Sequence, residues 1–163
     1  MTNRKIETVR FMSQCAAEES EPYPNTAMIS ITGWSSFGCL EVNIKPGFHS
    51  FLRLTFDDVD EESLGVPVGS IPDFSPDGSI IVSGHLLPDL HHAREIVAFL
   101  EDGDFSHLVV HCYAGQSRSA AVAQFAADRY GAALLLRNHI VGTQYKNNRL
   151  YRLLNTAYLG SEQ

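Results

Sequence analysis

The sequence predicts a single α/β domain with a central, mainly parallel sheet and helices on both of its faces. Short apolar segments with strand periodicity alternate along the chain with segments of helical periodicity, as they do in parallel α/β sheets. The 163 residues are enough for one compact domain, and 44% of them are hydrophobic, which is typical of globular proteins. Polar clusters follow two of the predicted strands, and the carboxyl ends of strands are where α/β domains bind ligands.

Three strands and a short helix are predicted in the first third of the chain. The strands span residues 8–13, 26–32 and 51–56, and the helix spans residues 14–20. The third strand shows the clearest alternation, because Leu52, Leu54 and Phe56 share one face at a period of two. The loop before it contains Gly, Ser and Pro, and we expect one edge strand there, at residues 40–44.

A long irregular segment follows the third strand. It begins with the acidic run at residues 57–62, and residues 63–83 are rich in Gly and Pro, which predicts a loop insertion with a small strand at residues 80–82. Three histidines follow without the spacing of a metal site, and we expect them on a helix surface: His85, His91 and His92.

The second half of the chain predicts two further helices around one more strand, and then a C-terminal helix. The bounds are residues 87–101 for the first helix, 107–111 for the strand and 119–130 for the second helix, which Gly131 ends. In the last helix Leu150, Leu153, Leu154 and Ala157 fall at helical spacing, and Gly160 is expected to close it.

Composition argues against several classes of protein. The net charge of −7 disfavours nucleic acid or an anionic membrane as a partner, because both select for basic surfaces. No run approaches the roughly 18 apolar residues of a membrane helix, and the start lacks a signal-peptide pattern. The three cysteines show no Cys-x-x-Cys spacing, so we expect a cytoplasmic protein without disulfides, metal or cofactor, in which Cys15 and Cys39 are buried apolar residues.

The loop between the strand at 107–111 and the helix at 119–130 carries the strongest chemical signal. Gly115 lets the chain curl, and backbone N–H groups together with the following helix N-terminus can bind a phosphate dianion. Arg118 adds a planar guanidinium, and these donors also favour a thiolate at Cys112, the expected nucleophile. The phosphate-binding residues expected from this geometry are Tyr113, Ala114, Gly115, Gln116, Ser117 and Arg118.

The segment from His111 to Ser119 resembles the signature His-Cys-x5-Arg-Ser/Thr of the cysteine-dependent protein tyrosine phosphatase superfamily. It is most similar to the compact, dual-specificity-like, single-domain phosphatases of prokaryotes and their viruses. Chance would produce these matched positions in roughly 5 of 100,000 chains of this composition. Further similar blocks lie at residues 27–32, 52–60, 93–100 and 148–154, although only the loop is highly specific.

The resemblance implies a role for each matched residue. Cys112 would attack phosphorus to form a thiophosphate intermediate, while Arg118 and the loop amides hold the phosphoryl oxygens. Ser119 would hydrogen-bond the thiolate when the intermediate breaks down, and His111 would support the loop from below. Asp58, in the segment after the third strand, would protonate the leaving group and then activate water.

The choice of acid leaves alternatives open. The distance along the chain from Asp58 to Cys112 is longer than the resemblance implies, and the excess falls within residues 63–83. Residues 71–74 resemble the Trp-Pro-Asp loop of the classical phosphatases with Ile in place of Trp, which makes Asp73 the main rival. Asp57 and Asp60 also remain candidates.

The expected function is hydrolysis of phosphotyrosine in a protein substrate, with activity on phosphoserine and phosphothreonine left open. An inositol or lipid phosphatase is second, because the loops of such enzymes usually carry Lys between Cys and Arg and this loop does not. A phosphate-binding protein without turnover is third. Trp34 and Tyr113 are candidate pocket walls, although an aromatic residue more often serves in packing, and only Tyr113 is favoured further by its place in the loop. The sequence leaves the oligomeric state open.

Overall fold

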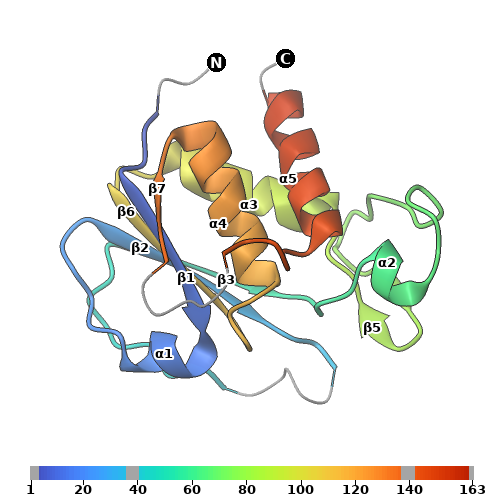
Figure 1. Ribbon diagram of the computed structural model, residues 1–163, viewed down its shortest axis with the longest axis horizontal. Helices are drawn as coiled ribbons and strands as arrows, with labels where there is room; N and C mark the ends of the chain where they lie inside the picture. Colours follow the sequence, from blue (N-terminus) through green and yellow to red (C-terminus); the bar gives the residue numbers. More distant parts are fainter. Residues whose placement is uncertain (1–3, 36–40, 137–141, 162–163) are drawn as a thin grey trace.

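The computed structural model describes residues 4–35, 41–136 and 142–161, and its centre is a five-stranded parallel sheet (Figure 1). The strand order is β3-β2-β6-β1-β7, and every neighbouring pair is parallel. The strands are β1 (Thr8–Ser13), β2 (Thr26–Thr32), β3 (Ser50–Thr55), β6 (His107–Cys112) and β7 (Ala133–Leu135). The predicted parallel α/β architecture is confirmed at this level, and β6 occupies the centre of the sheet.

Three long helices gather on one side of the sheet in Figure 1, and the short first helix lies apart from them. The long helices are α3 (Leu90–Asp102), α4 (Arg118–Tyr130) and α5 (Asn148–Ser161), and the short one is α1 (Gln14–Glu19). No helix in the described ranges is both long enough and apolar enough to cross a membrane.

Alternation along the strands divides the buried residues between the two faces of the sheet. Val110 on β6 belongs to the main core together with Phe125 of α4. The preceding residue, Val109, points the other way and packs with Met28 of β2 and Ala17 of α1. Successive side chains of a strand point to opposite faces, so α1 covers the face that the three long helices leave open.

The segment between β3 and α3 contains a short helix and a small hairpin. These are α2 (Glu61–Leu64) and the antiparallel pair β4 (Ile81–Val82) and β5 (His85–Leu86). The expected insertion at residues 63–83 is mostly irregular, as predicted. A fully buried arginine, Arg149 of α5, binds this segment by donating to the Pro72 and Pro88 carbonyls and to the Glu61 carboxylate, each at 2.7 Å.

Several local predictions differ from the structure. Residues 41–44 form no strand, and Leu40 lies outside the described residues. The strand β7 was missed because three residues are too few to show a period. The helix α5 continues through Gly160 to Ser161, since a glycine lowers helix propensity by only about 1 kcal/mol. Cys15 is exposed on α1, contrary to the expectation of burial, and Cys39 lies outside the described residues.

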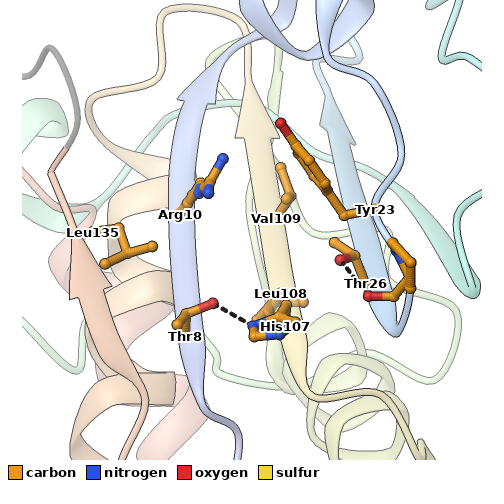
Figure 2. Close-up of a pocket in the computed structure, with 9 residues that line it drawn as sticks. Thr8, Arg10, Tyr23, Thr26, His107, Leu108, Val109 and Leu135 are labelled. Carbon is orange, nitrogen blue, oxygen red and sulfur yellow. Dashed lines mark hydrogen bonds between the residues drawn. The ribbon is translucent and has the colours of Figure 1, made fainter.

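A cavity of about 320 Å³ lies on the sheet where its strands begin (Figure 2). Thr8, Thr26 and His107, the first residues of β1, β2 and β6, line it, and Thr8 Oγ1 lies 2.8 Å from His107 Nδ1. Parallel α/β sheets bind ligands at the opposite end, where the strands finish. The loop that follows β6 lies at that end.

Candidate functional site

The loop between β6 and α4 rests on the end of β1. Gly115 has φ +72°, and a Cβ atom at this residue would lie 2.3 Å from Ser13 N and 2.4 Å from the Met12 carbonyl carbon. No side chain fits there, so Gly115 is required for the loop to approach the neighbouring strand. The backbone N–H of Gln14 also donates to the Tyr113 carbonyl at 3.1 Å. The loop is therefore held in one conformation by α1 and β1.

Cys112 is the last residue of β6, and its sulfur lies inside the loop. The side chain is 2% exposed. The Gly115 N–H donates to Sγ at 3.3 Å, and the Ser119 hydroxyl lies 3.2 Å from Sγ. Donors placed around a cysteine in this way stabilise a negative sulfur. The structure thus brings Ser119 to the position that the resemblance implies for it.

Arg118 is buried beside the loop with part of its hydrogen-bonding capacity unused. Its Nη1 donates to the Phe56 carbonyl at 2.8 Å, which fixes the guanidinium. Its Nε is buried and has no hydrogen-bond partner among the described residues. A buried donor without an acceptor costs about 1–3 kcal/mol, so an anion that accepted from Nε would recover that energy.

The N-terminus of α4 also has free donor capacity. Ser117 is its N-cap residue, but the side chain makes no capping bond to the helix. The Ser117 hydroxyl instead donates to Asp58 Oδ1 at 2.6 Å. The first N–H groups of a helix have no partner within the helix, and they attract negative charge. The helix and Arg118 together form a site suited to an anion.

A cavity of about 170 Å³ opens beside this loop. Four separate segments contribute to its walls, which come from the end of β2, the end of β3, the β4–β5 hairpin and the loop itself. The lining residues are Gly33, Ser35, Asp57, Asp58, Val59, His85, Tyr113 and Arg118. Cys112 lies directly before Tyr113 and is not itself a lining residue.

Asp58 is the candidate acid that the structure places against the loop. Its Oδ1 accepts hydrogen bonds from Ser117 Oγ at 2.6 Å and from Asn147 Nδ2 at 3.0 Å. Asn147 is held in turn at the start of α5, where its Oδ1 accepts from the Leu150 N–H at 2.9 Å. Asp58 Oδ2 has no hydrogen bond within the described part of the chain.

Asp57 lines the same cavity but has a different environment. Its Oδ1 accepts from the N–H groups of Trp34 and Ser35 and from the Ser35 hydroxyl, at 2.9 to 3.0 Å, and its Oδ2 accepts from the Leu86 N–H at 2.9 Å. Burial by itself raises the pKa of Asp57, but these hydrogen bonds outweigh burial and lower the pKa. A general acid must hold a proton, so Asp57 is better suited to a structural role.

The two remaining candidate acids lie away from the cavity. Asp60 is the N-cap of α2, where its Oδ1 accepts from the Ser63 N–H at 2.8 Å. Asp73 forms an ion pair with Arg152 of α5, with N–O distances of 2.9 and 3.1 Å. Neither residue lines the cavity. Of the four carboxylates considered, only Asp58 both lines the cavity and contacts the loop.

His111 lies beneath the loop, as expected. Its ring is fully buried, with Nε2 2.6 Å from Ser30 Oγ and Nδ1 3.3 Å from the Cys112 carbonyl oxygen. Burial is the main cause that lowers the pKa of His111, against the hydrogen bond to the Cys112 carbonyl, which raises it. A neutral ring in this position fixes the end of β6 without adding charge.

The structure adds His85 and Asn147 to the site. His85 was expected on a helix surface, which is wrong, because it lies on β5 and lines the cavity. Its position depends on how the irregular segment folds, and no local pattern reveals that. Asn147 precedes α5, and the preference of Asn for helix N-caps is the one signal that could have identified it.

The other two histidines lie on α3, as predicted, but the expected surface position is wrong for His92, which is buried. His91 is partly exposed and pairs with Glu95, whereas His92 is buried and accepts from the Asp89 N–H at 3.0 Å. No group of three or more His, Cys, Asp or Glu side chains within the described ranges could hold a metal ion.

No family model, curated protein or solved structure matches the chain. The geometry of the β6–α4 loop and the chemistry of the side chains around its cavity are therefore the features of the molecule that bear on its function.

Proposed function

We propose that the protein is a protein phosphatase that hydrolyses phosphotyrosine through a cysteinyl-phosphate intermediate. The observation that carries the proposal is the β6–α4 loop. It surrounds the Cys112 sulfur with donors, buries Arg118 with an unused Nε donor, and contacts the Asp58 carboxylate. The resemblance of residues 111–119 to the signature of the cysteine-dependent phosphatases supports the same function, with the loop as the phosphate-binding element of a phosphatase-like fold.

In the first step the Cys112 thiolate attacks phosphorus, and the bond from phosphorus to the phenolic oxygen breaks. Arg118 and the loop N–H groups hold the phosphoryl oxygens through the transition state. The leaving phenolate takes the proton from the Asp58 carboxyl group, so tyrosine departs neutral. Because Ser117 and Asn147 both bind Oδ1, the carboxyl group is oriented with Oδ2 as the proton carrier.

In the second step the Asp58 carboxylate accepts a proton from water, and the resulting hydroxide attacks phosphorus. The sulfur–phosphorus bond breaks, which releases inorganic phosphate and returns Cys112 as a thiolate. The Ser119 hydroxyl, 3.2 Å from Sγ, donates a hydrogen bond to the sulfur as it leaves. No metal or cofactor takes part in either step.

Exposed aromatic side chains support an aryl phosphate as substrate. Tyr113 lines the cavity and is 56% exposed. Trp34 is 43% exposed and stands between Gly33 and Ser35, which also line the cavity. An aromatic wall such as Tyr113 suits the ring of a phosphotyrosine, because offset and edge contacts between rings are favourable. Activity on phosphoserine and phosphothreonine is a question for measurement.

The charge of the cavity disfavours the alternative of an inositol or lipid phosphatase. Asp57 and Asp58 line the cavity, Arg118 is the one arginine among its described lining residues, and the loop contains no lysine. These carboxylates would repel substrates that carry several phosphate groups. If no acid reached the loop, the protein would bind phosphate without turnover. The contact between Asp58 and Ser117 argues against that alternative.

The test is hydrolysis of a phosphotyrosyl peptide and a matched phosphoseryl peptide in the presence of a chelator. Phosphate release is measured for the wild type, for Cys112→Ser, and for Cys15→Ser, which removes an exposed thiol outside the site. Release that Cys112→Ser abolishes and Cys15→Ser preserves is the expected result. A Cys112→Ser variant with near-normal turnover would overturn the mechanism. No release from either peptide by the wild type would overturn the proposed substrate class, and inositol phosphates would be tested next.

A further inference from the structure

We propose that His85, which lies beside Asp57 and lines the same cavity as Arg118, is a further substrate-contacting residue and binds the phosphoryl group. The inference rests on the proposed function and deepens it, because it assigns a role in substrate binding to the irregular segment between β3 and α3. The resemblance of the loop to the phosphatases gives His85 no such role.

The surroundings of the His85 imidazole ring support a role in binding. Its Nδ1 is buried and makes no hydrogen bond to any described residue. The Asp57 Oδ2 atom lies 3.8 Å from this nitrogen, while 44% of the His85 side chain is exposed. The ring therefore turns one nitrogen toward a carboxylate, and its remaining exposed surface borders the cavity.

Asp57 is a fixed negative charge beside the His85 ring. Hydrogen bonds from Trp34, Ser35 and Leu86 hold its two oxygens in place. The carboxylate cannot rotate without breaking several of these bonds. A carboxylate beside one ring nitrogen of a histidine sets which face the other nitrogen presents, as it does for histidines in many sites.

The backbone attaches His85 to the site through its neighbour Leu86. The Asp57 N–H donates to the Leu86 carbonyl at 2.7 Å, and the Leu86 N–H donates to Asp57 Oδ2 at 2.9 Å. These two hydrogen bonds join the β4–β5 hairpin to the end of β3. The position of His85 in the cavity wall thus follows from one main-chain hydrogen bond and one bond from the Leu86 N–H to the Asp57 side chain, not from a chance contact of a surface side chain.

The charges of the residues that line the cavity also support a role of His85 in binding. Among the described residues that line it, Arg118 is the only permanently charged cation, whereas Asp57 and Asp58 supply two carboxylates. A phosphate monoester arrives as a dianion at neutral pH, so one arginine does not balance it. An imidazolium at His85 has a donor for the Asp57 carboxylate and a second donor for a phosphoryl oxygen. The chemical class recognised is a phosphate monoester dianion.

The experiment measures binding of inorganic phosphate by calorimetry, which requires no turnover. The variants are His85→Ala and, as a matched control, His91→Ala on α3. Both histidines are partly exposed and lie near a carboxylate, but His91 pairs with Glu95 outside the cavity. We expect His85→Ala to weaken phosphate binding about tenfold, the scale of one charge-assisted hydrogen bond, and His91→Ala to change it less than twofold.

Kinetics with a phosphotyrosyl peptide provide the second readout. We expect His85→Ala to raise KM several-fold with a smaller change in kcat, because the ring contacts the phosphoryl group and not the leaving oxygen. His85→Gln retains a donor without the charge and should fall between the wild type and His85→Ala. It also replaces His85→Ala if thermal melting shows that the alanine variant does not fold.

The outcomes separate this inference from the proposed function. Phosphate binding and KM equal in His85→Ala and His91→Ala, with turnover still dependent on Cys112, would overturn the role of His85 and leave the phosphatase intact. Phosphate binding that Arg118→Lys does not weaken would overturn the proposed anion site itself.

Discussion

The Ser117 hydroxyl donates a hydrogen bond to Asp58 Oδ1 at 2.6 Å, although the two residues are 59 positions apart in the chain. Ser117 is the N-cap of α4, where a serine side chain ordinarily binds the helix N–H groups. Here it binds the carboxylate that follows β3. One hydroxyl therefore connects the loop that would hold the phosphate to the carboxylate that would protonate the leaving group, and it leaves the helix N-terminus open to an anion.

The role of Asp58 as the acid predicts a particular dependence on the leaving group. Asp58→Asn should lower kcat about 10²- to 10⁴-fold for aryl phosphates with basic leaving groups, and much less for those with acidic leaving groups. The measurement is kcat across a series of substituted phenyl phosphates. Asp73→Asn is the control, since Asp73 pairs with Arg152 away from the cavity. The role would be reassigned to Asp73 if Asp58→Asn slowed all substrates of the series equally and if the slowing by Asp73→Asn increased steeply with the basicity of the leaving group.

Asn147 serves two functions that different substitutions can separate. Its Oδ1 caps α5 by accepting from Leu150, and its Nδ2 donates to Asp58 and to the Val59 carbonyl. Asn147→Ala should lose all three contacts, and loss of the cap alone should cost about 1 kcal/mol of unfolding free energy, while loss of the bond to Asp58 should lower kcat. Asn147→Ser restores a capping oxygen but cannot reach Asp58 in the same way. We therefore expect Asn147→Ser to recover stability in urea denaturation and not to recover kcat; recovery of both would contradict the positioning role.

Gly115 should tolerate no side chain, for a reason beyond its backbone angle. A Cβ there would overlap the Ser13 and Met12 backbone, whereas at Gly131, with a similar positive φ of +68°, it would meet no atom within 4 Å. Gly131→Ala should cost about 1 kcal/mol, which is the strain of the left-handed backbone alone. Gly115→Ala should cost several-fold more, because the loop or β1 must move. Thermal melting of both variants checks this, and equal losses would show that the contact with β1 is unimportant.

Because His92 is buried, we expect the protein to lose stability in mild acid. Burial is the main cause that lowers its pKa from 6.5 to about 4, against the Asp89 carboxylate, which raises it. Between about pH 6.5 and 4 the unfolded chain binds a proton on this residue and the folded chain does not, so the free energy of unfolding falls as pH decreases through that window. The loss from this residue is on the order of 3 kcal/mol by pH 4.

The measurement for His92 is the midpoint of urea unfolding at several pH values, for the wild type and for His92→Gln. The variant should be less stable at pH 7, since the ring accepts a hydrogen bond from the Asp89 N–H and stacks near Phe56. Its stability should nevertheless change less between pH 6.5 and 4. An unchanged pH slope in the variant would assign the acid sensitivity to other groups.

The sequence determined those features that depend on neighbours along the chain. The alternation in β3 and the helical spacing in α3 identified their buried faces, because each element must turn its apolar residues toward one core. The interval from Cys112 to Arg118 is likewise local. A strand that ends and a helix that begins six residues later bring the two side chains to one loop whatever the rest of the chain does.

The tertiary structure alone decided which distant side chains join that loop. Asp58, Asp60 and Asp73 are equivalent in chemistry, and only the path of the chain between β3 and α3 sends Asp58 to Ser117 and Asp73 to Arg152. The same is true of His85, because two hydrogen bonds between Asp57 and Leu86, one of which involves the Asp57 side chain, bring it to the cavity. Such long-range pairings depend on the packing of the whole chain, and the local periodicity of a sequence does not contain them.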